Sequence, residues 1–70
     1  MKVTINGLAR EIPENMNILT LLKNLSIENN ISLAGAIVLV NEVLIPRDNW
    51  KESIPEDSAN IEIVSFVSGG

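Results

Sequence analysis

The sequence predicts an α+β fold in which one main helix covers one face of a mixed sheet of four or five strands. Three observations predict this class: polar and apolar residues alternate near both ends of the chain, one apolar stripe has helical spacing, and Pro, Gly or Asn residues separate these segments. Seventy residues make one domain, and the 46% hydrophobic content supplies an aliphatic core. We expect residues 1–67 to form the domain and residues 68–70 to form a flexible tail.

The first predicted element is a β-hairpin. Residues 2–5 alternate polar and apolar, and Asn6-Gly7 supplies the two positive φ angles of a type I′ turn. The return strand covers residues 8–12. Arg10 falls on the otherwise apolar face of that strand, so we expect an edge strand, where the charge reaches water.

A helix is predicted for residues 18–25. Asn17 is a good N-cap, and the apolar stripe after it has the i, i+3, i+4, i+7 spacing of one helix face: Ile18, Leu21, Leu22 and Leu25. Residues 26–35 are polar and irregular, and we expect Ile27 and Leu33 to anchor them to the core.

Three strands are predicted in the second half of the chain. Residues 36–40 form a short, β-branched run typical of a buried strand, residues 43–45 form a second short strand, and residues 61–67 form the last. The charged connection between the last two covers residues 51–60, with Ile54 expected to be buried.

The order of these elements determines the sheet. A helix that follows a hairpin must bury its apolar stripe on one face of the sheet, and the last strand then fills the centre beside the first strand. This arrangement is a β-grasp, the ubiquitin-like fold, and it leaves the other face of the sheet open.

Composition excludes several classes of function. The chain has no Cys and no His, so it has no thiolate nucleophile, no imidazole acid–base group and no Cys or His metal site. Nucleic acid binding is not expected, because Lys and Arg are not clustered and Trp50 and Phe66 are the only aromatic residues. The longest apolar run, residues 36–40, is too short to span a membrane. The lack of Cys and of an export signal favours the cytoplasm.

Charge is unevenly distributed. The net charge is −4, and all of it falls in residues 36–70, because residues 1–35 are balanced. Acidic residues of this kind are typical of solvated loops, and together they also fit a partner with a basic docking surface.

The chain ends in Phe-Val-Ser-Gly-Gly. The two glycines are consistent with a frayed terminus or a remnant of cloning. They are also consistent with a functional terminus, whose carboxylate reacts after the glycines have carried it into a narrow site.

Two segments resemble one protein family. The stretch VNEVLIPRDNW, residues 40–50, and the final IEIVSFVSGG resemble the sulfur-carrier proteins of thiamine (thiazole) biosynthesis, and the opening KVTING looks like the first strand and turn of that family. The segment with Pro46, Arg47 and Trp50 is the more specific part, because many ubiquitin-like proteins share a terminal Gly-Gly.

The resemblance implies a two-step chemistry at Gly70. An E1-like adenylyltransferase uses ATP and Mg²⁺ to convert the Gly70 carboxylate into an acyl-adenylate. A persulfide donor such as a cysteine desulfurase then supplies sulfur, and the resulting thiocarboxylate gives its sulfur to a thiazole synthase. The carrier is a co-substrate in this scheme, with no catalytic residue, metal or permanently bound cofactor of its own.

The residues make physical sense of this scheme. Gly69 and Gly70 have no side chains to obstruct a channel and tolerate the backbone angles that it imposes, and Ser68 completes the tail. We expect Trp50 to be a packing anchor and Arg47 to brace a loop.

The alternation of side chains along strands predicts a docking surface on the open face. Ile61 and Ile63 should face the helix together with Val38 and Val40, which leaves Ile37, Leu39, Val64 and Phe66 on the open side. We expect Leu39, Val64, Phe66 and the adjacent Val67 to bind partner proteins.

Other functions remain open at this point. The small subunit of molybdopterin synthase shares the fold and the Gly-Gly end, but that family usually has a proline before the glycines, which is missing here. A ubiquitin-like modifier or a carrier for tRNA thiolation would use the same Gly70. A binding module with an idle tail is the remaining alternative.

Overall fold

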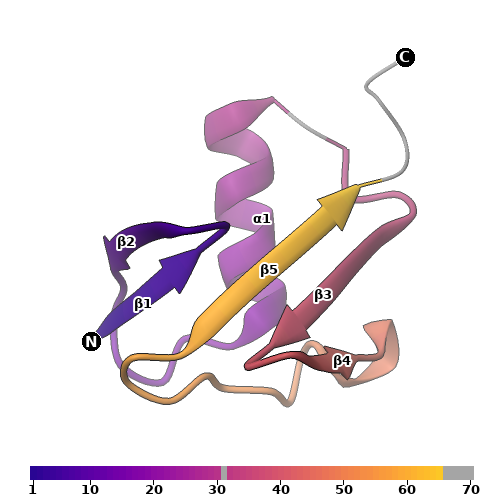
Figure 1. Cartoon of the computed structure of the whole chain (residues 1–70). Coiled ribbons are helices and arrows are strands. Elements are labelled where there is room, and N and C mark those ends of the chain that lie inside the picture. The colour runs from indigo at the N-terminus through magenta and orange to yellow at the C-terminus, as the bar shows by residue number, and fades with distance from the viewer. Residues whose placement is uncertain (31, 66–70) are drawn as a thin grey trace.

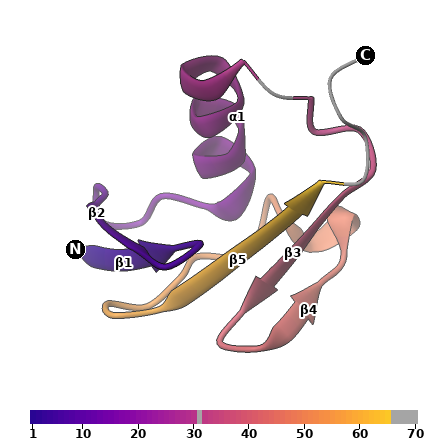
Figure 2. The same ribbon diagram turned by 45° about the horizontal axis from the view of Figure 1, so that its top comes forward.

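The computed structural model describes residues 1–30 and 32–65 and contains a five-stranded mixed sheet with helix α1 packed across one face (Figure 1). The elements follow one another as β1 (Lys2–Ile5), β2 (Leu8–Glu11), α1 (Ile18–Asn29), β3 (Ala36–Val40), β4 (Val43–Ile45), the short 3-10 helix η1 (Arg47–Asn49) and β5 (Asn60–Ser65). A second view shows α1 on one side of the sheet (Figure 2).

The strand order in the sheet is β2-β1-β5-β3-β4. The last strand therefore lies in the centre, parallel to β1 and antiparallel to β3, and the two hairpins form the outer parts of the sheet. The predicted β-grasp arrangement is confirmed. Helix α1 connects β2 to β3 across one face of the sheet, and β5 fills the position between β1 and β3.

The hairpin forms as its turn residues predict. Asn6 and Gly7 have φ angles of 50° and 85°, as a type I′ turn requires. The prediction of an edge strand is confirmed, since β2 is at one end of the strand order. The guanidinium of Arg10 extends from this edge to α1, where Nη2 donates a hydrogen bond to Oε2 of Glu28 at 2.6 Å.

Helix α1 begins where predicted, because Oδ1 of Asn17 accepts a hydrogen bond from the backbone N–H of Thr20. Its predicted end at Leu25 was wrong, since the helix continues to Asn29 and ends with Asn30 in the left-handed conformation. The apolar stripe stops at Leu25, and Ile27, Glu28 and Asn29 of the last turn are exposed. A pattern of buried apolar residues therefore does not mark this turn.

Two predicted anchors were also wrong. Ile27 is 81% exposed, because two residues after Leu25 the helix has turned about 200° away from the core. Ile54 is 51% exposed, and the adjacent Pro55 is buried instead. The prediction for Leu33 was correct, since its side chain is partly buried and packs against the core.

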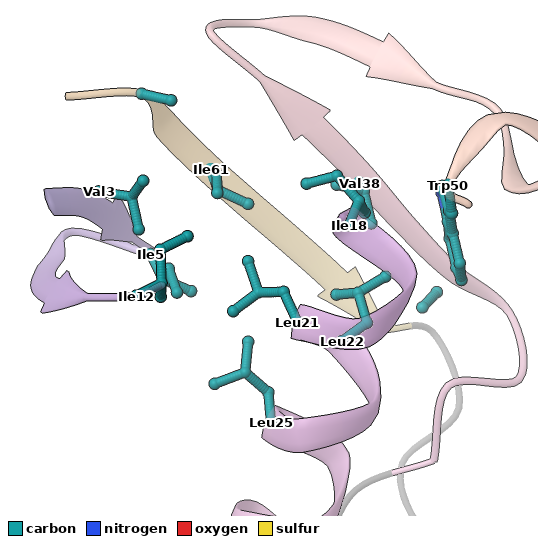
Figure 3. Close-up of a cluster of buried hydrophobic side chains, with 12 residues drawn as sticks. Val3, Ile5, Ile12, Ile18, Leu21, Leu22, Leu25, Val38, Trp50 and Ile61 are labelled. Atoms are coloured by element: carbon teal, nitrogen blue, oxygen red, sulfur yellow. The ribbon is translucent and has the colours of Figure 1, made fainter. Parts of the chain in front are cut away.

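The core lies between α1 and the sheet. The four stripe residues of the helix face Val3, Ile5, Val38 and Ile61 of the central strands, and Trp50 closes one side of the cluster (Figure 3). Ile63 and Val40 are partly buried against this cluster, so the predicted inward face of β5 and β3 is confirmed. The strands nearest the C-terminal residues are thus held by the main core.

The segment after η1 holds the start of the helix. The backbone N–H of Ile18 donates to the carbonyl of Ser53 at 2.8 Å, and that of Leu19 donates to the carbonyl of Trp50 at 3.1 Å. The first N–H groups of a helix have no partner within the helix. The connection from η1 to β5 therefore supplies acceptors to α1 and fixes its position over the sheet.

Candidate functional site

The face of the sheet opposite α1 carries a group of apolar side chains at its β5-β3-β4 end. We name this group the open-face patch, and its described members are Ile37, Leu39, Leu44 and Val64. The register sets Ile37 opposite Val64 and Leu39 opposite Leu44, so the four side chains lie on adjoining positions of three strands. Leu44 is 55% exposed and Val64 is 43% exposed, and Ile37 and Leu39 on the strand between them are partly buried. An apolar surface shared by adjoining strands is a candidate site for a protein partner.

The structure places the predicted docking residues as follows. Leu39 and Val64 lie on the open face, as the alternation along β3 and β5 predicted. The other predicted site residues lie outside the described residues: Phe66, Val67, Ser68, Gly69 and Gly70. The binding and chemical roles of all seven stay predictions.

Leu44 is the patch residue that sequence reasoning missed. It lies in a three-residue strand, which is too short to show which of its faces is buried. Only its pairing with Leu39 assigns Leu44 to the open face. The neighbouring Val43 and Ile45 pair with Val40 and Val38, which face the helix, so the register would have shown that Leu44 points the other way.

One carboxylate lies within the patch. Glu62 is exposed and pairs with Leu39 across the β5–β3 ladder. By contrast, Glu56 and Asp57 lie in the connection that enters β5 at the other end of the strand, and Oδ1 of Asp57 accepts a hydrogen bond from the backbone N–H of Lys2. The carboxylate of Glu62 therefore lies on the open face, beside Leu39 of the patch.

Strand β5 is fixed at its start by Asn41. The backbone N–H of Asn41 donates to the carbonyl of Asn60 at 2.7 Å, and its side-chain Oδ1 accepts from the N–H of Asn60 at 2.9 Å. From there the ladder with β3 continues to the pair Ala36 and Ser65. The strand that leads to the C-terminal residues is consequently central and paired along its described length.

The segment that carried the family resemblance braces the entry to β3. Trp50 is buried and donates from Nε1 to the carbonyl of Ile45 at 3.0 Å. Nη2 of Arg47 donates to the carbonyl of Leu33 at 2.7 Å. These contacts agree with the predicted roles of Trp50 as a packing anchor and Arg47 as a loop brace, and Trp50 lies in the core rather than over the open face.

Within residues 1–30 and 32–65, no three or more Asp, Glu, His or Cys side chains gather where they could hold a metal ion. In the same part of the chain, no helix has the length and apolar composition needed to cross a membrane.

Comparisons with known proteins agree with this geometry. The model of the ThiS family matches residues 3–70. A crystal structure of the thiamine biosynthesis protein ThiS from Geobacter metallireducens superimposes with a TM-score of 0.82 at 24% identity and covers all of both chains. An NMR structure of a thiamine biosynthesis protein from the same organism gives a TM-score of 0.72 at 23% identity, covering all of this chain and 88% of the other. None of the curated proteins gives a significant match.

The two solved structures establish the fold, and the family match extends over nearly the whole sequence, including the Pro46-Arg47 and Trp50 segment and the terminal glycines. The chain belongs to the ThiS family, the ubiquitin-like sulfur carriers of thiamine biosynthesis.

Proposed function

We propose that the Gly70 carboxylate is the group that carries sulfur. A carboxylate oxygen attacks the α-phosphorus of ATP and releases pyrophosphate, which gives an acyl-adenylate. A persulfide sulfur then displaces AMP and, after its S–S bond is reduced by a second thiol, leaves a thiocarboxylate on Gly70. The single observation that carries this proposal is the match to the ThiS family up to Gly70, with glycine at both final positions.

The catalytic groups for these steps belong to partner proteins. The chain has no Cys to carry a persulfide and no His for proton transfer. An E1-like adenylyltransferase would bind ATP and Mg²⁺, a cysteine desulfurase or similar protein would supply the persulfide, and a thiazole synthase would accept the sulfur. We place these events in the cytoplasm, where protein thiols are kept reduced and can form and release persulfides.

The open-face patch is proposed as the docking surface for the activating enzyme. Its supporting feature is position: Val64 is on the strand that continues into the C-terminal residues, so a protein docked on the patch is close to the base of the tail. Residues 66–70 span at most about 18 Å when fully extended. A partner seated on β3, β4 and β5 can therefore place its active site within reach of Gly70.

The test is reconstitution with a cognate adenylyltransferase, ATP, Mg²⁺ and a sulfur donor, followed by intact-mass analysis. We expect one oxygen to be replaced by sulfur in the wild-type chain and no such product after deletion of Gly70. Gly69→Val should leave the fold unchanged and slow the reaction, because a branched side chain obstructs the channel. Thiocarboxylate on the deletion variant would refute the assignment of Gly70.

The ThiS match favours the thiamine pathway over a molybdopterin synthase subunit or a protein modifier. Adding a thiazole synthase to the charged carrier separates these functions. Consumption of the thiocarboxylate with formation of thiazole phosphate supports the proposal, whereas attachment of Gly70 to lysine side chains would support a modifier.

A further inference from the structure

The side chain of Asn6 continues the pairing of β1 with β5 after β1 has ended. The backbone N–H groups of Thr4 and Asn6 donate to the carbonyls of Ala59 and Ile61, each at 2.9 Å. One step further along β5, Oδ1 of Asn6 accepts from the N–H of Ile63 at 2.8 Å, and Nδ2 donates to the Ile63 carbonyl at 3.3 Å. The carboxamide thus takes the place of a peptide group, and we name this pair of bonds the Asn6 clasp.

The same residue is chemically vulnerable. Asn6 precedes Gly7 in the single Asn-Gly pair of the sequence. A backbone nitrogen that follows Asn can attack the side-chain Cγ, and glycine hinders this approach least because it has no Cβ. Gly7 is exposed, and a Cβ built on it would meet nothing within 4 Å. The turn at Gly7 is therefore exposed to water.

We infer that Asn6 is a site of spontaneous deamidation that the folded clasp suppresses. In the reaction, the Gly7 nitrogen bonds to Cγ of Asn6, ammonia leaves, and a five-membered succinimide forms. Water then opens either carbonyl of the ring to give aspartate or isoaspartate, with no oxidant or reductant involved. The clasp opposes the first step, because both polar atoms of the carboxamide are bound to Ile63 and Cγ cannot turn toward Gly7.

The two products affect the fold differently. Aspartate keeps an oxygen that accepts from the Ile63 N–H but loses the Nδ2 donor. Isoaspartate inserts an extra carbon into the main chain, so the type I′ turn and the clasp cannot both form. Figure 2 shows the β1–β2 turn beside β5. Isoaspartate at position 6 should therefore detach the turn from the strand that leads to the C-terminal residues.

The experiment compares the full-length chain in buffer and in unfolding concentrations of urea, both at mildly alkaline pH. Cleavage with trypsin releases residues 3–10, and mass spectrometry with electron-based fragmentation separates Asn6 from its aspartate and isoaspartate products. We expect Asn6 to deamidate at least about tenfold more slowly in the folded chain than in the chain unfolded by urea. A tenfold difference corresponds to a free energy of about 1.4 kcal/mol for breaking the Asn6 clasp. Equal rates in the two conditions would overturn the inference.

Asn41 is a matched control in the same digest. It also has positive φ, at 50°, and its Oδ1 is bound to the backbone of β5, but it precedes Glu42 rather than glycine. We expect it to stay unmodified in urea during the time in which Asn6 reacts. A comparable rate of deamidation at Asn41 would show that the glycine after Asn6 does not determine the rate at Asn6.

Hydrogen exchange on the separated products tests the consequence for the fold. The Ile63 N–H should lose protection in the isoaspartate form and retain it in Asn6→Asp, which keeps the acceptor. The Asn60 N–H, bound to Asn41, should stay protected in both. An isoaspartate form with full protection at Ile63 would refute the role of the clasp.

Discussion

The guanidinium carbon of Arg47 lies 4.5 Å from the centroid of the Trp50 ring. In this position its Nη2 reaches the carbonyl of Leu33, which also accepts the N–H of Ala36 at 3.1 Å. Ala36 in turn pairs with Ser65, the last described residue of β5. The segment that carried the family resemblance therefore braces the connection beside the strand that leads to the C-terminal residues.

Arg47→Ala removes the brace and should lower the free energy of unfolding by about 1 kcal/mol, the range of one hydrogen bond plus an exposed cation–π contact. Arg47→Lys keeps a charge near the ring but lacks the planar fork, so we expect partial recovery. Urea unfolding followed by circular dichroism measures both variants. Wild-type stability in Arg47→Ala would show that the brace contributes nothing to folding.

Trp50 is a larger element of the core. Trp50→Ala should cost about 3–5 kcal/mol, a large part of the stability of a domain of this size, so the variant should be largely unfolded. Trp50→Phe fills most of the space but leaves the Ile45 carbonyl without the Nε1 donor, which should cost about 1–3 kcal/mol. Thermal unfolding followed by circular dichroism ranks the stabilities of the wild type and the two variants. A Trp50→Phe variant as stable as the wild type would contradict the role of the Nε1 hydrogen bond.

Docking is tested by charges on the two faces of the molecule. Val64→Asp and Leu44→Asp put a carboxylate into the open-face patch and should weaken binding to the activating enzyme by about tenfold or more. Ile27→Asp is the control, because Ile27 is 81% exposed on α1, away from the patch. Calorimetric titration of folded variants provides the affinities. An equal loss of affinity in all three variants would indicate a general effect of the added negative charge and would contradict docking at the patch.

The Arg10–Glu28 pair predicts a small dependence of stability on pH. The hydrogen bond from Arg10 lowers the pKa of Glu28 in the folded chain. The stabilisation is therefore complete above the unfolded pKa of about 4.3 and is lost as the pH falls through the lower folded value. Glu28→Gln should be slightly less stable than wild type at neutral pH, and the difference should vanish in acid. A difference in melting temperature that grows toward acid pH would contradict this sign.

The sequence by itself determined the order of the elements, the hairpin turn, the start of the helix and the membership of a family. These features depend on residues that are neighbours in the sequence. An Asn-Gly pair favours the positive φ angles of a type I′ turn, as Asn6 and Gly7 show, and Asn17 caps the helix that follows it. The alternation along β5 likewise predicted the open-face position of Val64 without any knowledge of its partners.

Tertiary structure alone decided which distant residues meet. The last turn of α1 is not marked by burial, and Leu44 joins the patch only through its register with Leu39. The bonds from Arg47 to Leu33 and from Asn6 to Ile63 join residues 14 and 57 positions apart. Local patterns report which face of an element is apolar, but pairing between elements depends on how the whole core packs, so these contacts could not be predicted from the sequence.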